Sequence, residues 1–139
     1  MSNILIAVAT MIIGFVLTTY GAYAGYYSLS RSTTVMRVQS SLERQLVYID
    51  AAEQDLGRVP APDDLVMSRI TGESRFGLDY SYTKPGAVGL LCVQSARNDY
   101  TAEALEIVAE QRPGALYGST CNTSSGPSAS SVSLTVRID

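Results

Sequence analysis

A run of apolar residues near the start of the chain, residues 4–24, constrains the fold more than any other feature. No charged side chain precedes Arg31, and no proline separates this run from an amphipathic stretch that reaches Leu56. One continuous helix over that length would measure about 80 Å, at roughly 1.5 Å per residue. The rest of a 139-residue chain cannot enclose such a helix. Its apolar half therefore needs lipid or other copies of the chain around it, which favours a structural role.

The composition excludes several classes of function. The chain has ten Lys or Arg and thirteen Asp or Glu, a net charge of −3, and no basic cluster of the kind that nucleic-acid-binding proteins carry. It contains no histidine, which excludes His-based nucleophile pairs, His ligands for zinc and a His acid–base group. The remaining carboxylates, Lys84 and the tyrosines form no constellation suited to catalysis. We therefore expect a non-enzymatic protein without cofactor or metal, and no nucleic-acid partner.

Cys92 and Cys121 are the two cysteines. Two thiols without histidine cannot complete a zinc site. They are either unrelated buried thiols or one disulfide, and their spacing alone does not decide between these. A bond between them would close a loop of about 30 residues and contribute ~3–4 kcal/mol in the chain-entropy model. Because a small exported domain with a thin core benefits most from such a bond, we expect the disulfide.

Three interpretations of residues 4–24 compete, since the segment is long enough to span the ~30 Å core of a bilayer. A cleaved signal peptide is the first, because Ala22-Tyr23-Ala24 resembles a cleavage site, but no basic region precedes the apolar run. A single-pass anchor is the second; Arg31 and Arg37 would then hold the following residues in the cytoplasm, in conflict with a disulfide. The third interpretation, which we expect, is a segment that stays in the mature chain. The conflict between the two arginines and the disulfide disappears if a basic leader before Met1 was removed after insertion.

Small residues recur inside this segment. They are Thr10, Gly14, Thr18 and Ala22 at four-residue spacing, with Gly21 and Gly25 as a second pair. Small side chains at this spacing let helix backbones approach closely in apolar surroundings, so we expect this face to pack against other helices. Four tyrosines follow, at positions 20, 23, 26 and 27, and their expected place is the belt at the end of an apolar span.

The second half of the expected helix is apolar on one side. Its heptad positions hold Val35, Val38, Leu42, Ile49, Ala52 and Leu56, with Gln45 as an exception, and Met36, Leu46 and Val47 widen the stripe. A coiled coil is one alternative, but the widened stripe favours packing on a sheet. Gly57, Pro60 and Pro62 then predict the end of the helix.

The remaining residues predict one small domain. The pattern indicates a short helix over 63–70, strands over 78–83, 87–94 and 130–138, and a helix over 98–111 with Leu105, Val108 and Ala109 inward. We expect an α+β fold in which an antiparallel sheet of three or four strands packs on residues 30–56. Residues 122–131 predict a surface loop, and Asn122-Thr123-Ser124 makes Asn122 a candidate glycosylation site.

The layout resembles the type IV pilin family. The matching features are Met1, the Ile12-Ile13-Gly14 sequence, the Gly57-Arg58-Val59-Pro60 turn and a C-terminal disulfide region. The resemblance implies a protruding hydrophobic helix over 1–28 and a head domain over 29–139. It also implies a homo-oligomeric filament outside the cell, an inner-membrane stage before assembly, and an assembly machinery as partner. A membrane-anchored exported binding domain, a minor or tip pilin, and a secretion-system pseudopilin are the alternatives.

Two positions depart from the family pattern. The fifth residue is Leu5, where the family has a glutamate that is thought to neutralise the N-terminal amine of a neighbouring subunit. Leu5 cannot do this, so Ser2, Asn3 or Thr10 would have to solvate the amine of Met1, or a methylated amine stays poorly compensated. The proline that the family has near position 22 is replaced by Ala22.

Overall fold

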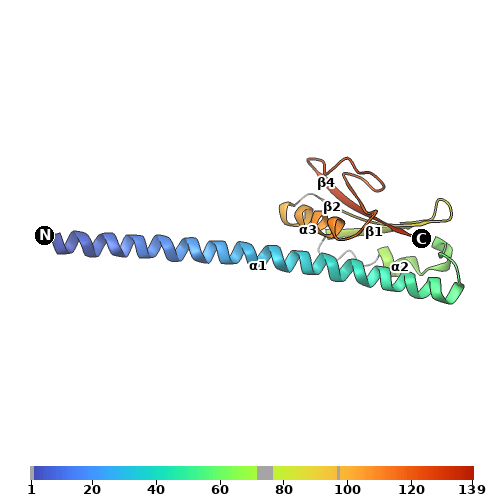
Figure 1. The fold of residues 1–139 in the computed structure, drawn as a ribbon, viewed down its shortest axis with the longest axis horizontal. Helices are drawn as coiled ribbons and strands as arrows, with labels where there is room; N and C mark the ends of the chain where they lie inside the picture. Colours follow the sequence, from blue (N-terminus) through green and yellow to red (C-terminus); the bar gives the residue numbers. More distant parts are fainter. Residues whose placement is uncertain (1, 72–76, 97) are drawn as a thin grey trace. The chain divides into compact units, whose positions relative to one another are not determined.

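The computed structural model describes residues 2–71, 77–96 and 98–139 (Figure 1). Its first element is a single helix, α1, over Ser2–Leu56, so the expected continuous helix is confirmed. By their contacts the residues divide into two compact units, 1–33 and 34–139. The first unit is the N-terminal part of α1, and the second holds the rest of α1 with all other elements.

The second unit is built on a four-stranded antiparallel sheet. Its strands are β1 (Leu78–Thr83), β2 (Gly89–Ala96), β3 (Leu116–Gly118) and β4 (Ser131–Ile138), in the order β1-β2-β4-β3. The expected α+β fold with a small antiparallel sheet is therefore confirmed. The pattern did not predict β3, which has only three residues and pairs with β4 alone.

The pairing register defines the two faces of the sheet. Tyr80 of β1 lies opposite Val93 of β2, which in turn lies opposite Leu134 of β4. These three side chains are at most 4% exposed, and they belong to the core shared with α1. The next residue along each strand points to the other face, where Ser81, Cys92 and Thr135 are aligned.

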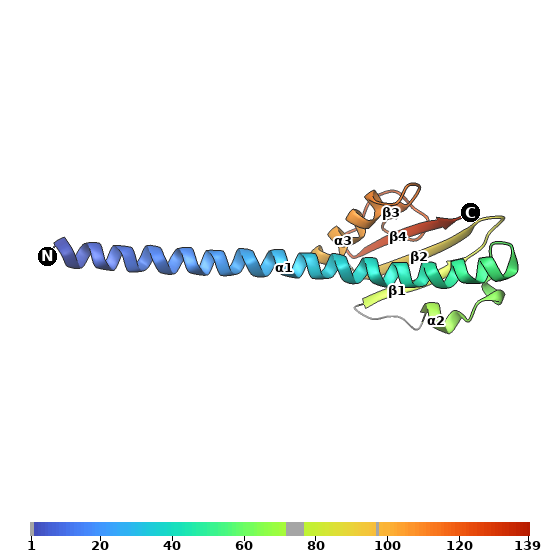
Figure 2. The same cartoon turned by 60° about the horizontal axis from the view of Figure 1, so that its bottom comes forward.

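The second half of α1 packs on the inner face of the sheet, between α2 and α3 (Figure 2). Val38, Leu42 and Ile49 are buried there as the heptad pattern predicts. The prediction that Met36 and Val47 belong to the buried stripe is wrong, because each side chain is 67% exposed. Both lie more than about 100° around the helix from Leu42, and a helix on a sheet buries one stripe only.

Leu56, also assigned to the buried stripe, is 43% exposed because it is the last residue of α1. The helix ends at Gly57, whose φ of 67° is the left-handed conformation that glycine adopts readily, and whose N–H donates to Glu53 O at 2.8 Å. The turn that follows is held by β1: Tyr82 Oη donates to Pro60 O at 2.7 Å.

Polar side chains of α1 reach the neighbouring elements. Gln45 interrupts the apolar pattern, yet it is only 3% exposed because its Nε2 donates to Arg69 O at 3.3 Å in α2 (Met67–Thr71). Tyr48 Oη accepts from Val66 N at 2.9 Å, and Ser41 Oγ accepts from Tyr80 Oη at 2.8 Å. In place of the single helix expected over 63–70, the structure has a 3₁₀ turn over Pro62–Asp64 and the short helix α2.

The helix expected over 98–111 is α3, over Asp99–Glu110. Asn98 caps it, because its side chain accepts from Tyr100 N at 3.0 Å. Leu105 and Val108 are buried in the core, as expected. Tyr117 of β3 donates from its Oη to Ala102 O at 3.0 Å, which joins α3 to the sheet edge.

Candidate assembly surface

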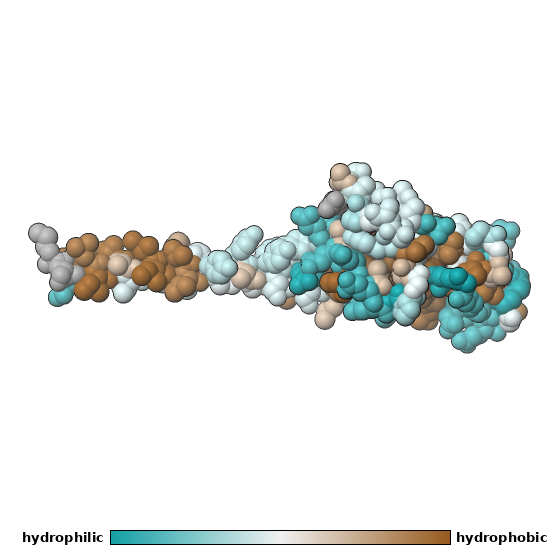
Figure 3. All heavy atoms as spheres, turned by 45° about the horizontal axis from the view of Figure 1, so that its top comes forward, coloured by the Kyte–Doolittle hydropathy of each residue, from teal (hydrophilic) through white to brown (hydrophobic). Residues whose placement is uncertain are grey.

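The N-terminal unit exposes almost all of its apolar surface. The exposed fraction of its large apolar side chains ranges from 46% at Tyr27 to 81% at Met11. Figure 3 shows the strongly apolar residues as a brown band over the first part of this helix, followed by paler residues. The helix is long and apolar enough to cross a membrane, with none of its most apolar stretch buried. This surface is therefore available either to lipid or to other helices.

Small residues line one side of this helix. At about 100° per residue, nine of them fall within about 40° of a single line along its axis. They are Asn3, Ala7, Thr10, Gly14, Thr18, Gly21, Gly25, Ser28 and Ser32. Ala22, assigned to the same face, lies about 80° from Gly14 and so stands at its border. We call the nine residues the small-residue face.

Four members of this face, Asn3, Ala7, Ser28 and Ser32, were not predicted from the sequence. The signal was present as alternating steps of three and four residues, which a search for strict four-residue spacing does not detect. The tyrosines at 20, 23, 26 and 27 lie about 120° or more from Gly14, on the opposite half of the helix. Bulky aromatic and small side chains are thus separated on two sides of one helix.

The glycines of the small-residue face are not required by the fold of one chain. A Cβ atom built at Gly14, Gly21 or Gly25 meets nothing within 4 Å. A larger side chain there creates no clash inside the single chain. Any limit on side-chain size at these positions must therefore come from a neighbouring molecule.

The threonines in this segment satisfy their hydroxyl donors within the helix. Thr10 Oγ1 donates to Ala7 O at 2.9 Å, Thr18 Oγ1 to Gly14 O at 2.9 Å, and Thr19 Oγ1 to Phe15 O at 2.7 Å. Such bonds to the preceding turn remove the cost of placing a hydroxyl donor in apolar surroundings. These residues therefore suit lipid or a helix bundle as well as water.

Leu5 is 71% exposed and lies about 180° from Gly14, on the side opposite the small-residue face. Met1, whose amine a neighbouring carboxylate would neutralise, lies outside the described residues. Between Asn3 and Arg31 the sequence has no carboxylate. How the amine is compensated therefore stays a prediction.

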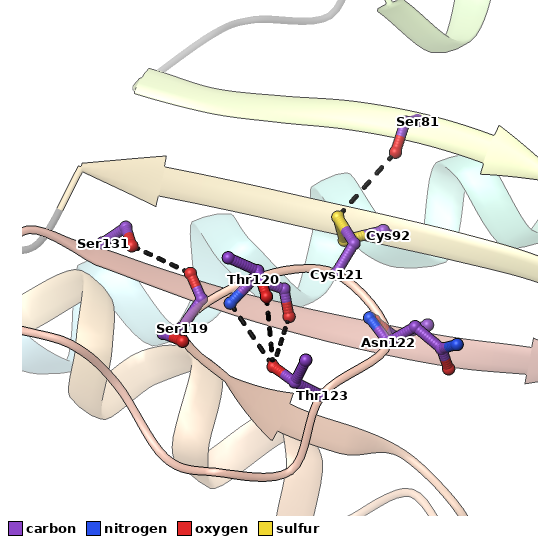
Figure 4. Close-up of a disulfide and its surroundings, with 9 residues drawn as sticks. Ser81, Cys92, Ser119, Thr120, Cys121, Asn122, Thr123 and Ser131 are labelled. Carbon is purple, nitrogen blue, oxygen red and sulfur yellow. Dashed lines mark hydrogen bonds between the residues drawn. A yellow bond between two sulfur atoms is a disulfide. The ribbon is translucent and has the colours of Figure 1, made fainter.

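The expected disulfide joins Cys92 to Cys121, with an S–S distance of 2.00 Å and a Cα–Cα distance of 5.8 Å. The alternative of two unrelated thiols is therefore wrong. Cys92 is 3% exposed on the outer face of the central strand β2, whereas Cys121 is exposed on the loop between β3 and β4. Figure 4 shows Ser81 of β1 beside the bond, with its Oγ 4.0 Å from Cys121 Sγ.

The loop that carries Cys121 folds closely against β3 and β4. Asn122 has a φ of 61°, and its N–H donates to Thr135 Oγ1 at 2.7 Å. Thr123 Oγ1 donates to Thr120 O at 2.7 Å (Figure 4). A Cβ atom at Gly118 would clash with Thr123 O. Asn122 itself is exposed, and its glycosylation stays a prediction.

Within the described ranges, no group of three or more His, Cys, Asp or Glu could hold a metal ion. A hollow of about 520 Å³ lies near the β1–β2 turn, and Arg137 is the one ionisable residue in its lining. Asp64 accepts from Arg58 Nη1 and Ala61 N, each at 2.8 Å, and these bonds hold the pKa of its carboxyl below the usual 3.8.

We compared the chain with models of known families, with curated proteins and with solved structures, and no match was found in any of the three.

Proposed function

We propose that this chain is a structural, non-enzymatic subunit of an extracellular type IV pilus-like filament. The observation that carries the proposal is the exposed apolar surface of the first unit of α1, next in sequence to a disulfide-bonded α+β unit. One chain cannot bury that surface itself. Identical copies can, if their helices pack together as a bundle.

The small-residue face of the helix supports packing between copies. Removing an apolar helix from lipid and placing it among other apolar helices gains little from the hydrophobic effect. The association must come largely from close contact, which the small-residue face allows at Gly14, Gly21 and Gly25. The assembly machinery would supply the remaining work of extracting the helix from the inner membrane.

The disulfide supports a final location in an oxidising compartment. Cys121 is exposed, so in a reducing compartment its sulfur would be accessible to attack by thiols. Together with the resemblance at Ile12-Ile13-Gly14 and Gly57-Arg58-Val59-Pro60, this favours a protein that is exported and works at the cell surface. The subunit would pass through the inner membrane before it enters the filament.

The test is substitution on the small-residue face. The variant Gly14→Leu/Gly21→Leu should block filament formation, because two leucines on this face keep neighbouring backbones apart, while the disulfide and the sheet form normally. Ile12→Leu/Val16→Leu is the matched control, since it places two leucines on the opposite side. Electron microscopy of sheared cell-surface material is the measurement. Normal fibres from the Gly14→Leu/Gly21→Leu variant would contradict the packing claim.

An anchored exported binding domain is the second candidate, because the same helix is long and apolar enough to span a membrane. It predicts no fibres from the unaltered chain, and monomers that stay in the membrane fraction. A minor or tip subunit differs from the main proposal in copy number. Mass spectrometry of purified fibres would separate these two.

A further inference from the structure

The strongly apolar part of the first unit of α1 ends at Thr19. Large apolar side chains dominate residues 4–19, whereas residues 20–27 hold four tyrosines separated by glycine and alanine. Figure 3 shows the same change along the helix, where the brown band gives way to paler residues. On the other side, the polar residue Asn3 precedes the band. The apolar length of this helix is therefore about 24 Å, at roughly 1.5 Å per residue.

This apolar length is shorter than an ordinary bilayer requires. The hydrocarbon core of a typical bilayer is about 30 Å thick, so residues 4–19 fall short of it by about 6 Å. The threonines of this stretch do not shorten it further, because their hydroxyl groups donate to carbonyls of the preceding turn. Residues 4–24 would be long enough, but Tyr20 and Tyr23 are among the last of them.

The tyrosines fit the headgroup layer better than the hydrocarbon core. Tyr20, Tyr23 and Tyr26 are each at least 70% exposed, and an amphipathic phenol ring favours the boundary between lipid and water. Residues 20–27 extend over about 10 Å of helix, close to the headgroup depth of about 5–8 Å on each side of a bilayer. Helices that pack through the small-residue face leave these tyrosines in contact with lipid, since they lie on the opposite half.

We propose that residues 4–19 are a short membrane span with the tyrosines in the headgroup layer, and that the mismatch with the bilayer gathers copies of this chain before assembly. The inference rests on the proposed function, which supplies the stage in the inner membrane. A span that is too short is accommodated by local thinning of the bilayer or by association of the helices. Two adjacent helices share part of the thinned lipid, so its cost falls when copies meet. The bilayer thus supplies a driving force that the hydrophobic effect between helices does not.

Association in vesicles of different thickness tests the proposal. The full chain with the substitution Ser68→Cys accepts donor and acceptor maleimide dyes at that site, because Ser68 is exposed on α2 and Cys92 is bonded to Cys121. Energy transfer between copies should be measured in dimyristoleoyl, dioleoyl and dierucoyl phosphatidylcholine vesicles, at one protein-to-lipid ratio. From the thinnest to the thickest bilayer, the association constant should rise by about tenfold.

A pair of double variants tests whether the apolar span ends before Tyr20. Tyr20→Leu/Tyr23→Leu extends the apolar run to Ala24, about 31 Å, and should associate several-fold more weakly than the unaltered chain in dioleoyl vesicles. Tyr26→Leu/Tyr27→Leu is the matched control. It also replaces two tyrosines by leucine, but it leaves Tyr20 and Tyr23 in place, so its association should match that of the unaltered chain.

The depth of single residues can be measured directly, because the chain contains no tryptophan. The fluorescence of a Tyr23→Trp variant should be quenched more strongly by lipids brominated near the headgroup than by lipids brominated near the chain ends. Phe15→Trp should show the reverse order, since Phe15 lies within the apolar span. Both native side chains are at least 70% exposed, so neither substitution disturbs packing within one chain.

The outcomes separate this inference from the filament proposal, because the vesicles contain no assembly machinery. Association that does not change with thickness overturns the inference, even where fibres form normally on cells. Equal association of the two leucine variants, or stronger quenching of Tyr23→Trp by the deeper bromines, overturns the boundary at Tyr20. Association that rises with thickness, from a chain that gives no fibres on cells, leaves the short span in place and overturns the filament.

Discussion

Removing the disulfide should lower the free energy of unfolding by about a quarter or more of the value that is typical of a small domain. The perturbation is Cys92→Ala/Cys121→Ala; alanine is chosen because Cys92 is 3% exposed and a serine there would bury a hydroxyl. The bond joins residues 29 apart in sequence, so it closes a loop of about 30 residues. The chain-entropy relation for that loop gives about 3.6 kcal/mol at 25 °C.

The assay is urea unfolding of the full chain in mild detergent. Near-UV circular dichroism should be followed, because Tyr80 and Tyr82 are at most 4% exposed and report packing of the sheet on α1. With a slope of about 2 kcal/mol per molar urea, the midpoint should fall by about 2 M. The single variant Cys121→Ala is the control, since it breaks the bond and leaves the buried Cys92 side chain in place.

Two results would contradict this prediction. A loss below about 1 kcal/mol with an unchanged slope would show that the loop stays ordered without the bond, held by contacts such as Asn122 N to Thr135 Oγ1. A large loss in the double variant with almost none in Cys121→Ala would assign the effect to packing at Cys92 instead.

Two further predictions concern the sheet. Gly118→Ala should destabilise the chain by about 1–3 kcal/mol, because its Cβ would clash with Thr123 O, whereas Gly86→Ala, with nothing within 4 Å, should be nearly neutral in the same urea assay. The pKa of the Tyr82 phenol is raised above 10.0, mainly by burial and then by the charges of Glu53 and Asp64. The folded state therefore holds this proton more tightly than the unfolded state, so its stabilisation is complete below pH 10 and is lost as the pH rises further; Tyr82→Phe should flatten that alkaline loss, and an equally steep loss in the variant would refute the assignment.

The fold was predictable wherever one segment determines its own structure. The heptad positions of Val38 and Leu42, the stop at Gly57 and the alternation in β1 all follow from local periodicity and turn chemistry. Strand β3 was not predictable, because three residues carry too little pattern. The burial of Gln45 was not predictable for a different reason: it depends on the carbonyl of Arg69, twenty-four residues away in sequence.

For the candidate surfaces too, one feature was predictable from the sequence and another was not. The small-residue face lies on one helix, so its position follows from spacing alone once steps of three and four are both allowed. A groove of about 340 Å³ beside Val47 is lined by residues of α1, of the turn after α3 and of the C-terminal part of β4, so it requires all three to meet. No spacing in the sequence encodes that meeting, and the heptad pattern accordingly assigned Val47 to the buried stripe.

The position of β4 inside the sheet has a consequence for biosynthesis. Strand β3 pairs with β4 alone, and all eight residues of β2 are opposite residues of β4. Until residues 131–138 have left the ribosome, β3 has no strand partner and β2 has one open edge. Pairing between segments this far apart in sequence is also slow. In the exported subunit proposed above, the unit of residues 34–139 should therefore complete its fold only after export, and during translocation its exposed strands would depend on chaperones or on the speed of secretion.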